Sequence, residues 1–421
     1  MGPRHVMFGT AVALSILAQG ARADDSNFRP YAVGSRAAGM GGAFTGLADD
    51  GSGPFYNPGG VAFARRSQLS LSGSVYGIVS GTFEDALGDG HDFSYRNLNV
   101  FPTATSAVWK LGAPEAASAN VIALSVFVPD AFNADDRDTL GSKQNAFFLS
   151  SQVQTVWMGL TYARRMGPVG VGATGFFLLG TRLQQLDLTL APSGQFGTIS
   201  SRVDESTQGF VGALGIRWDV TGWLHLGASV YSPAVGWGSR RVFVRGVAAP
   251  TAGEPQMVVE NEDHLHASPT EPLRAQGGLA FTTGRLTLTA DVIFLAPRDL
   301  TDDAGALFER RVVRKPVTNF AAGVEYVLSD RFPLRAGFFT DFAASRSPPD
   351  ASVENTSHVD RFGGTFSVGY RSDHTSTDLG LNVSGGSGQD LVPRNLDFSD
   401  LRVTGSSQLL LYVFLATSYE F

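Results

Sequence analysis

Apolar residues alternate with small or polar residues along nearly the whole chain after residue 67. In one such segment Val156, Met158 and Leu160 are separated by single residues, one of them Gly159. A period of two places successive side chains on opposite faces of a β-sheet, and each segment is about as long as a transmembrane β-strand. We count 14 segments, which begin near residues 68, 101, 120, 152, 168, 208, 223, 273, 285, 318, 333, 361, 377 and 408.

The connections between these segments alternate in length. Short turns such as residues 165–168, 219–222 and 283–284 are followed by long polar stretches, and we expect residues 232–272 to be the longest loop. Outer-membrane barrels show short turns on the periplasmic side and long loops outside. The pattern therefore predicts an all-β fold, a 14-stranded antiparallel transmembrane β-barrel over residues 67–421, with both chain ends in the periplasm. A soluble β-sandwich is the alternative, but it would not alternate its loop lengths in this way.

The composition of the 421 residues favours the barrel and excludes several kinds of chemistry. The chain has 50 Gly, 30 Phe and 17% charged residues. It has no Cys, which rules out disulfides, a thiol nucleophile and thiolate metal ligands. The net charge of −7 argues against a nucleic-acid partner, which requires a basic face.

Residues 1–23 have the pattern of an export signal. Arg4 precedes an apolar run from residue 6 to residue 18, and Ala21-Arg22-Ala23 matches a cleavage site. The run is too short for the alternative, a membrane-spanning helix. We expect the mature chain to begin near Asp24.

A glycine-rich stretch at residues 34–63 fits neither a strand nor a sustained helix. Its Ala-Asp-Asp-Gly and Asn-Pro-Gly-Gly sequences predict turns. The stretch also contains Arg36, Ala38-Gly39-Met40-Gly41-Gly42-Ala43-Phe44, Ala48-Asp49-Asp50 and Tyr56-Asn57-Pro58. In these residues it resembles the N-terminal hatch of the FadL/TodX (OmpP1) family of outer-membrane transporters. Family members usually have Ala where this chain has Gly59.

The resemblance implies a hatch at residues 24–66 inside the barrel and passive uptake of long-chain fatty acids or other hydrophobic compounds across the bacterial outer membrane. It also implies that the hatch shifts to release the ligand sideways or past itself. The residues that carry this expectation are Gly39, Gly41, Gly42, Phe44, Asn57 and Pro58. Related outer-membrane proteins with a similar hatch sequence serve secretion. The alternative function is therefore a plugged barrel that acts as a secretion or surface-assembly partner.

The inward face of the expected strands combines apolar side chains with a few arginines. Such an interior suits a ligand with an apolar tail and an acidic head. As ligand-binding candidates in the lumen we take Phe127, Phe176, Leu178, Arg182, Arg335, Phe339, Arg361 and Phe414. Ile293, Leu410, Tyr412 and Arg274 belong to the same inward set. The alternative is that the aromatics pack against the hatch and the arginines pair with inward acids such as Asp291 and Glu325.

Other candidate sites are explained by surface chemistry. His264 and His266 form a possible metal pair without a third ligand, and residues 135–138 lack the spacing of a Ca²⁺ loop. No G-x-S-x-G elbow supports the remaining alternative, an outer-membrane lipid hydrolase. We therefore expect no enzyme activity, catalytic residue, metal or cofactor. The expected partners are hydrophobic small molecules, outer-membrane lipid and the barrel assembly machinery, which would recognise the C-terminal Phe421, and we expect a monomer.

Overall fold

The computed structural model describes residues 27–28, 31–85, 92–102, 104–112, 118–138, 146–190, 197–249, 256–265, 267–302, 310–349, 357–393 and 401–421. The expected export signal lies outside these residues. Near the N-terminus the chain forms three short helical pieces, α2 (Ser35–Gly39), α3 (Gly53–Tyr56) and the 3-10 helix η1 (Gly60–Phe63). Among the described helices, none has the length and apolar character needed to cross a membrane.

The rest of the described chain is almost entirely strand. The first strands are β1 (Gln68–Phe83), β2 (Phe93–Pro102), β3 (Ala104–Leu111), β4 (Ser118–Asp138), β5 (Ala146–Met166), β6 (Val169–Leu190) and β7 (Gly197–Asp219). There follow β8 (Leu224–Tyr231), β9 (Val235–Ala249), β10 (Gln256–Leu265), β11 (Arg274–Thr283), β12 (Leu286–Leu295), β13 (Arg298–Asp302) and β14 (Arg310–Arg314). The last are β15 (Val317–Val327), β16 (Pro333–Asp341), β17 (Ser357–Val359), β18 (Arg361–Arg371), β19 (Thr375–Pro393) and β20 (Leu401–Glu420).

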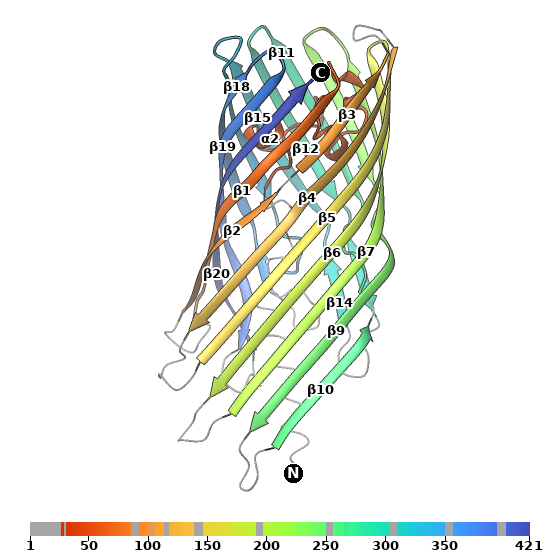
Figure 1. Ribbon diagram of the computed structural model, residues 1–421. Coiled ribbons are helices and arrows are strands. Elements are labelled where there is room, and N and C mark those ends of the chain that lie inside the picture. The colour runs from red at the N-terminus through yellow and green to blue at the C-terminus, as the bar shows by residue number, and fades with distance from the viewer. Residues whose placement is uncertain are drawn as a thin grey trace.

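These strands form one closed antiparallel barrel (Figure 1). The ladder closes where β1 pairs with β20, from Gln68 opposite Glu420 onward. Several wall strands are interrupted, so that β2 continues as β3, β8 as β9, β10 as β11 and β17 as β18. With each such pair taken as one strand, the described wall has 14 strands, and the predicted barrel is confirmed. The strands β13 and β14 form a separate hairpin.

The two ends of the barrel differ as predicted, with one correction. Tight turns such as Gly167 and Gly284, both at positive φ, close the end where the C-terminus lies (Figure 1). At the other end the strands are longer than a strand needs to be to span the bilayer, and β6 pairs with β7 as far as Leu190 opposite Gly197. The expectation that residues 232–272 are a loop is wrong, because β9 and β10 form a hairpin there and β9 extends along β7. His264 lies in β10, and His266 lies outside the described residues.

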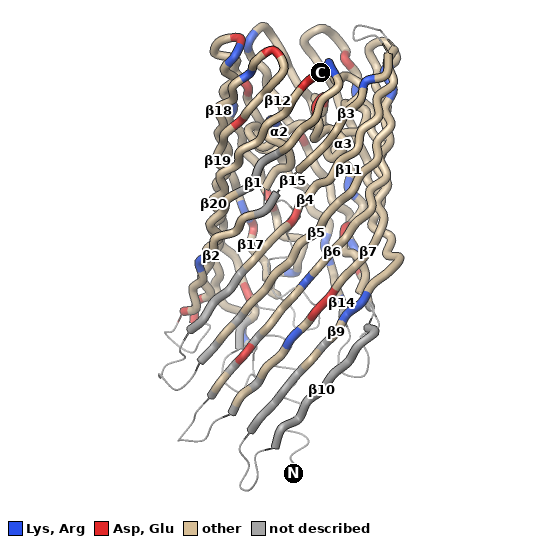
Figure 2. Tube along the Cα trace, viewed as in Figure 1, with Lys and Arg blue, Asp and Glu red and all other residues tan. Residues whose placement is uncertain are grey.

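The outer face of the wall carries a belt of apolar side chains. In β18 buried and exposed residues alternate along the strand, and the exposed ones include Phe362, Phe366 and Val368. Aromatic pairs gather near the short turns, for example Trp223 with Phe281 and Phe332 with Tyr370. An apolar belt edged by aromatic rings is the signature of a barrel that spans a lipid bilayer. Charged residues lie at the end with the short turns and along the described parts of the strands toward the other end (Figure 2).

Residues 31–64, which we call the inner segment, lie inside this barrel (Figure 1). Their apolar side chains are buried almost without exception, and they form small clusters with inward residues of the wall. The segment occupies the part of the lumen near the short turns, on the side of the C-terminus. It divides the lumen into a filled half and a half that opens toward the long strands.

Candidate functional site

The inner segment touches the wall so closely that only glycine fits at several points. At Gly41, φ is +64°, and an added β-carbon would lie 2.8 Å from the carbonyl oxygen of Phe338 in β16. Gly42 also has a positive φ, of +77°, which side chains rarely adopt. Gly39 faces Arg335 and Ser367 at similarly close range. The glycines that the sequence singled out therefore permit the backbone of the segment to lie directly on the strands.

Asn57 joins two turns of the inner segment to the wall. Its side-chain amide nitrogen donates to the carbonyl oxygens of Thr45 and Ile216, each at 2.9 Å. Its side-chain oxygen Oδ1 accepts from the backbone amide of Gly59 at 3.0 Å, and the residue is completely buried. Pro58 lies beside it against Gly215 and Gly172, two further glycines of the wall.

A second anchor lies on β12. One carboxylate oxygen of Asp291 accepts hydrogen bonds from the backbone amides of Phe44 and Thr45, both at 2.8 Å. The Phe44 ring is buried and meets the ring of Tyr56 edge to face, with 5.7 Å between centroids. A charged acceptor with two amide donors in a buried place makes a strong attachment.

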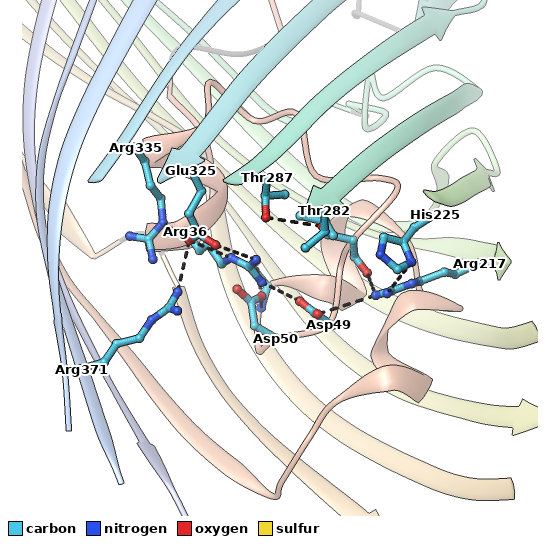
Figure 3. Close-up of polar contacts among 12 residues, drawn as sticks. Arg36, Asp49, Asp50, Arg217, His225, Thr282, Thr287, Glu325, Arg335 and Arg371 are labelled. Atoms are coloured by element: carbon cyan, nitrogen blue, oxygen red, sulfur yellow. Dashed lines mark hydrogen bonds and ion pairs between the residues drawn. The ribbon is translucent and has the colours of Figure 1, made fainter. Parts of the chain in front are cut away.

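A network of buried charges links the inner segment to both sides of the barrel (Figure 3). Arg36 donates two bonds to Glu325, at 3.0 and 3.2 Å, and one to Asp49 at 2.9 Å. Glu325 also accepts from Arg335 at 2.6 Å and from Arg371 at 3.1 Å. The network thus ties α2 to β15, β16 and β18 through charge-assisted hydrogen bonds.

On the opposite wall the network continues through β7. The guanidinium of Arg217 lies 3.7 Å from Asp49 and 2.9 Å from Asp219, and it donates to the carbonyl oxygen of Leu47 at 2.6 Å. Asp219 in turn bonds His225 of β8 at 2.7 Å. The inner segment is therefore held between arginines of two walls that face each other.

Burial and ion pairing act in opposite directions on the titration of the segment. Burial would raise the pKa of Asp49, but Arg36 and Arg217 outweigh it and hold the pKa below the ordinary 3.8. Burial would lower the pKa of Arg36, and the carboxylates of Glu325 and Asp49 raise it instead. For Asp50 burial prevails and raises the pKa, although Ser52 donates two hydrogen bonds to its carboxylate.

A cavity opens on the side of the inner segment that faces the long strands. Its empty space is about 1270 Å³, the connection to solvent included. Phe55 of the segment contributes to its lining, and Trp157, Leu178, Val211 and Tyr231 contribute from the wall. Phe55 meets the Trp157 ring edge to face at 5.8 Å, so segment and wall form one continuous apolar surface.

Charged groups also line the cavity. Arg274 lies over the Tyr231 ring, with 3.7 Å to its centroid, and donates to the carbonyl oxygen of Phe55 at 3.1 Å. Arg182 and Arg314 are further lining cations. The acids that line the same space are Asp130, Glu205 and Glu271. Within the described ranges, no group of three His, Asp or Glu side chains is arranged to hold a metal ion.

The lumen candidates from the sequence are all buried but fall in different places. Leu178 and Arg182 line the cavity, and Phe127 and Phe176 pack in the cluster that includes Leu178 and Trp157. Arg335 is paired with Glu325 and with Asp378, each at 2.6 Å, as the alternative reading of the arginines expected.

The remaining three candidates also lie away from this cavity. Arg361 pairs with Asp341 at 2.7 Å. Phe339 packs on Ala43 of the inner segment. Phe414 belongs to a cluster with Tyr31 and Tyr412. Phe339 and Phe414 therefore help to seat the segment, whereas Arg361 is paired with a residue of the wall.

The sequence reading missed most of the lining residues, among them the aromatic rings of Phe55, Trp157 and Tyr231. Phe55 was overlooked because a glycine-rich turn gives no periodicity to follow. Trp157 directly precedes the outward-facing Met158, and Tyr231 directly follows the outward-facing Val230. The alternation itself could have found both rings as inward residues.

The sequence by itself finds no relatives: no protein-family model and no curated protein matches it. Solved structures do match. A FadL homologue from Pseudomonas aeruginosa aligns with 94% of this chain and 100% of its own, with a TM-score of 0.69 and 14% identity. The chain has the fold of the FadL and TodX channels. The Pseudomonas putida toluene transporter TodX gives 0.66 at 15% identity, with 93% and 99% of the two chains covered. The Ralstonia pickettii toluene transporter TbuX gives 0.55 at 14% identity, with 94% and 100% covered. The FadL-type fold thus spans nearly the whole described chain.

Proposed function

We propose that this protein is an outer-membrane channel that takes up hydrophobic compounds passively, and that the inner segment is its hatch. The observation that carries the proposal is the cavity that lies against the inner segment, inside a barrel with an apolar outer belt. The solved channels of the same fold include a FadL homologue and two toluene transporters, which supports a hydrophobic cargo for this chain.

The apolar lining supplies a driving force for capture. Each CH₂ group that leaves water for such a surface gains ~0.8 kcal/mol. Phe55, Trp157, Leu178 and Val211 offer a surface for an alkyl tail or an aromatic ring. The energy is non-directional, so it selects hydrophobic compounds as a class.

We further propose that long-chain fatty acids are among the cargoes. Arg182 and Arg274 border the apolar lining, where a guanidinium can bond a carboxylate. Such a charge-assisted hydrogen bond contributes ~1.5–3 kcal/mol where water is excluded. A neutral ring such as toluene would use the apolar surface alone.

Passage through the barrel requires the hatch to yield. The segment fills the lumen beyond the cavity, and its attachments include side-chain bonds made by Asn57, Asp291, Arg36 and Arg217. A ligand that displaces Phe55 from the cavity would act on the turn that ends at Asn57. We propose that this shift is the gating step.

Uptake in whole cells tests the proposal. The gene would be expressed in a Gram-negative host that lacks its own channels of this kind, and radiolabelled oleate and toluene would be followed over time. We expect both to enter faster than in the empty host. Arg182→Met should reduce oleate uptake and leave toluene unchanged, whereas Arg202→Met, at an exposed pair on β7, should change neither. No uptake of either compound would refute the channel and favour a plugged barrel that serves secretion.

A further inference from the structure

Two smaller spaces adjoin the cavity along the inner segment. The first, which we call the middle pocket, holds about 410 Å³ of empty space, its openings included. It shares four lining residues with the cavity, and these are Phe28, Phe55, Pro129 and Arg274. Residues that line two spaces stand where the spaces meet, so the middle pocket lies directly beside the cavity.

The second space, which we call the end pocket, lies between α2 and the wall strands β19 and β20. It holds about 340 Å³ of empty space, its openings included. It shares Tyr31 and Ala32 with the middle pocket. The cavity is lined by β5, β6 and β7, so the three spaces together form a tract that crosses the lumen from these strands to β19 and β20.

The lining of this tract is mostly apolar. The rings of Phe28, Phe55 and Phe339 line the middle pocket, and Ala38 and Phe414 line the end pocket. Methylene groups gain free energy when they leave water for such a surface. An alkyl chain that begins in the cavity can therefore continue along the inner segment to the far wall.

Asn382 of β19 is the exception in the end pocket. Its side chain lines the pocket and is only 1% exposed, and among the described residues no group bonds its amide oxygen or its amide nitrogen. Two nearby hydroxyls are engaged, because Ser35 donates to Asp378 at 2.7 Å and Tyr31 donates to the carbonyl oxygen of Val128 at 2.5 Å. Buried polar groups nearly always have a partner. The Asn382 amide is therefore positioned to bond a molecule that enters the pocket.

The chemistry of the end pocket selects a neutral polar group. None of the described residues that line it is charged, so a second carboxylate or an ammonium group would be buried there without a counter-charge. An asparagine side chain offers a donor and an acceptor. A hydroxyl group can donate to the oxygen or accept from the nitrogen, so it suits the amide in either orientation.

We propose that the end pocket binds a hydroxyl group at the far end of a long-chain acid. The carboxylate stays at Arg182 in the cavity, the chain follows the tract past Phe55, and the hydroxyl bonds Asn382. The inference rests on the proposed uptake of fatty acids, and it names a cargo with an acid at one end and a hydroxyl at the other. A methyl end has no group for the amide to bond, so a plain acid binds more weakly.

Competition between ω-hydroxypalmitate and palmitate for the purified barrel tests the site, with bound ligand counted by native mass spectrometry. Asn382→Leu removes the amide and keeps a side chain of similar size. The preference for the hydroxy acid should be roughly tenfold greater in the wild-type protein than in this variant, as one or two hydrogen bonds imply. Both acids compete in one sample, so their different partition into detergent cancels between wild type and variant.

The matched control is Asn99→Leu on β2. Asn99 is also 1% exposed, and among the described residues no group bonds its amide. It stands in the same row of the wall, because Gly77 pairs with Asn99 and with Tyr412, which pairs with Asn382. The end pocket is lined by Asn382 and not by Asn99, so this control should keep the wild-type preference.

A second variant, Ala32→Leu, narrows the place where the middle and end pockets meet and leaves Asn382 intact. It should also lose the preference for the hydroxy acid. If both Asn382→Leu and Ala32→Leu are folded and keep the wild-type preference, the end pocket takes water only, and the inference is refuted while the channel stands. If the wild-type protein binds neither acid, the proposed fatty-acid cargo is refuted, and the inference with it.

Discussion

Arg36 offers the sharpest test of how the inner segment is held. It is the one side chain of the segment that bonds carboxylates on two sides, Glu325 of the wall and Asp49 of the segment itself. Arg36→Met keeps much of the side-chain length and removes three charge-assisted bonds. We expect the variant to leave the barrel folded and to detach the segment more often, because the wall ladders do not involve Arg36.

The size of the effect follows from burial. Removing one partner of a buried ion pair costs about 3–5 kcal/mol. Arg36 is 21% exposed, and Glu325 keeps Arg335 and Arg371, so the lower end, about 3 kcal/mol, applies. Since ~1.4 kcal/mol corresponds to a factor of ten, the detached population should rise roughly 100-fold.

Conductance of purified protein in planar bilayers measures that population. Deletion of residues 34–60 supplies the fully open reference, and Arg202→Met supplies the control, because the pair of Arg202 with Asp204 is more than half exposed and contributes little. A heat-modifiable band on gels reports the folded barrel. Open events as rare in Arg36→Met as in wild type, with the barrel folded, would contradict the role of the charge network. No leak from the deletion would contradict the plug itself.

Further predictions concern other parts of the chain. Asn57→Ala removes three buried hydrogen bonds worth ~1–3 kcal/mol in all and should alter uptake without unfolding the barrel; wild-type uptake would favour a segment that only fills space. Asp50→Asn should slow hydrogen exchange of the segment at pH 7, because the raised pKa of Asp50 means that its charged form destabilises the docked state. This penalty is present above the raised pKa and fades as the pH falls toward 3.8. Faster exchange in the variant would contradict this sign. Deletion of Phe421 should lower the yield of folded barrel in the membrane, and an unchanged yield would exclude it as an assembly signal. In intact cells an impermeant thiol reagent should label cysteine at His264 and spare cysteine at Thr221, and the reverse would overturn the orientation.

The pH response of Asp49 should differ from that of Asp50. The pKa of Asp49 is lowered in the docked state, so its contribution to docking is present above 3.8 and is lost only as the pH falls below that value. The two neighbouring carboxyls therefore contribute pH dependences of docking that are opposite in sign. Their difference arises because Asp49 meets two guanidinium groups, whereas Asp50 meets the neutral Ser52.

The membrane-spanning part of the fold was predictable because lipid imposes a pattern. Segments expected near residues 285, 318, 333 and 361 begin at 286, 317, 333 and 361. Toward the other end the prediction fails: β2 begins at 93 where 101 was expected, and β7 at 197 where 208 was expected. Strands that extend beyond the bilayer have no lipid to face. Their outer side can be polar, and the alternation that marks a spanning strand fades there.

The inward arginines show why the site was harder to predict than the fold. The alternation correctly turned Arg182 and Arg335 inward, yet one lines the cavity and the other is neutralised by the wall. Glu325 and Arg335 are direct ladder partners on β15 and β16, and that register is fixed by the turn between the strands. Arg36 reaches the same carboxylate only through the fold of the inner segment, which has no periodicity to read.

Prolines in otherwise regular strands carried a signal that the alternation conceals. The ladder between β8 and β11 ends at Tyr231 opposite Arg274, and Pro233, Pro269 and Pro272 follow on the two strands beyond that point. The wall is also disturbed near Pro102 and Pro129. There β2 ends, and the β4–β5 register shifts between Phe127 and Asp130.

At both disturbed places nearby apolar residues are strongly exposed, with Leu98 at 68% and Trp237 at 77%, and residues from both places line the cavity. A strand in the middle of a sheet excludes proline because each one costs a ladder bond. Prolines on two facing strands at one level therefore predict, from sequence, an interruption of the barrel ladder.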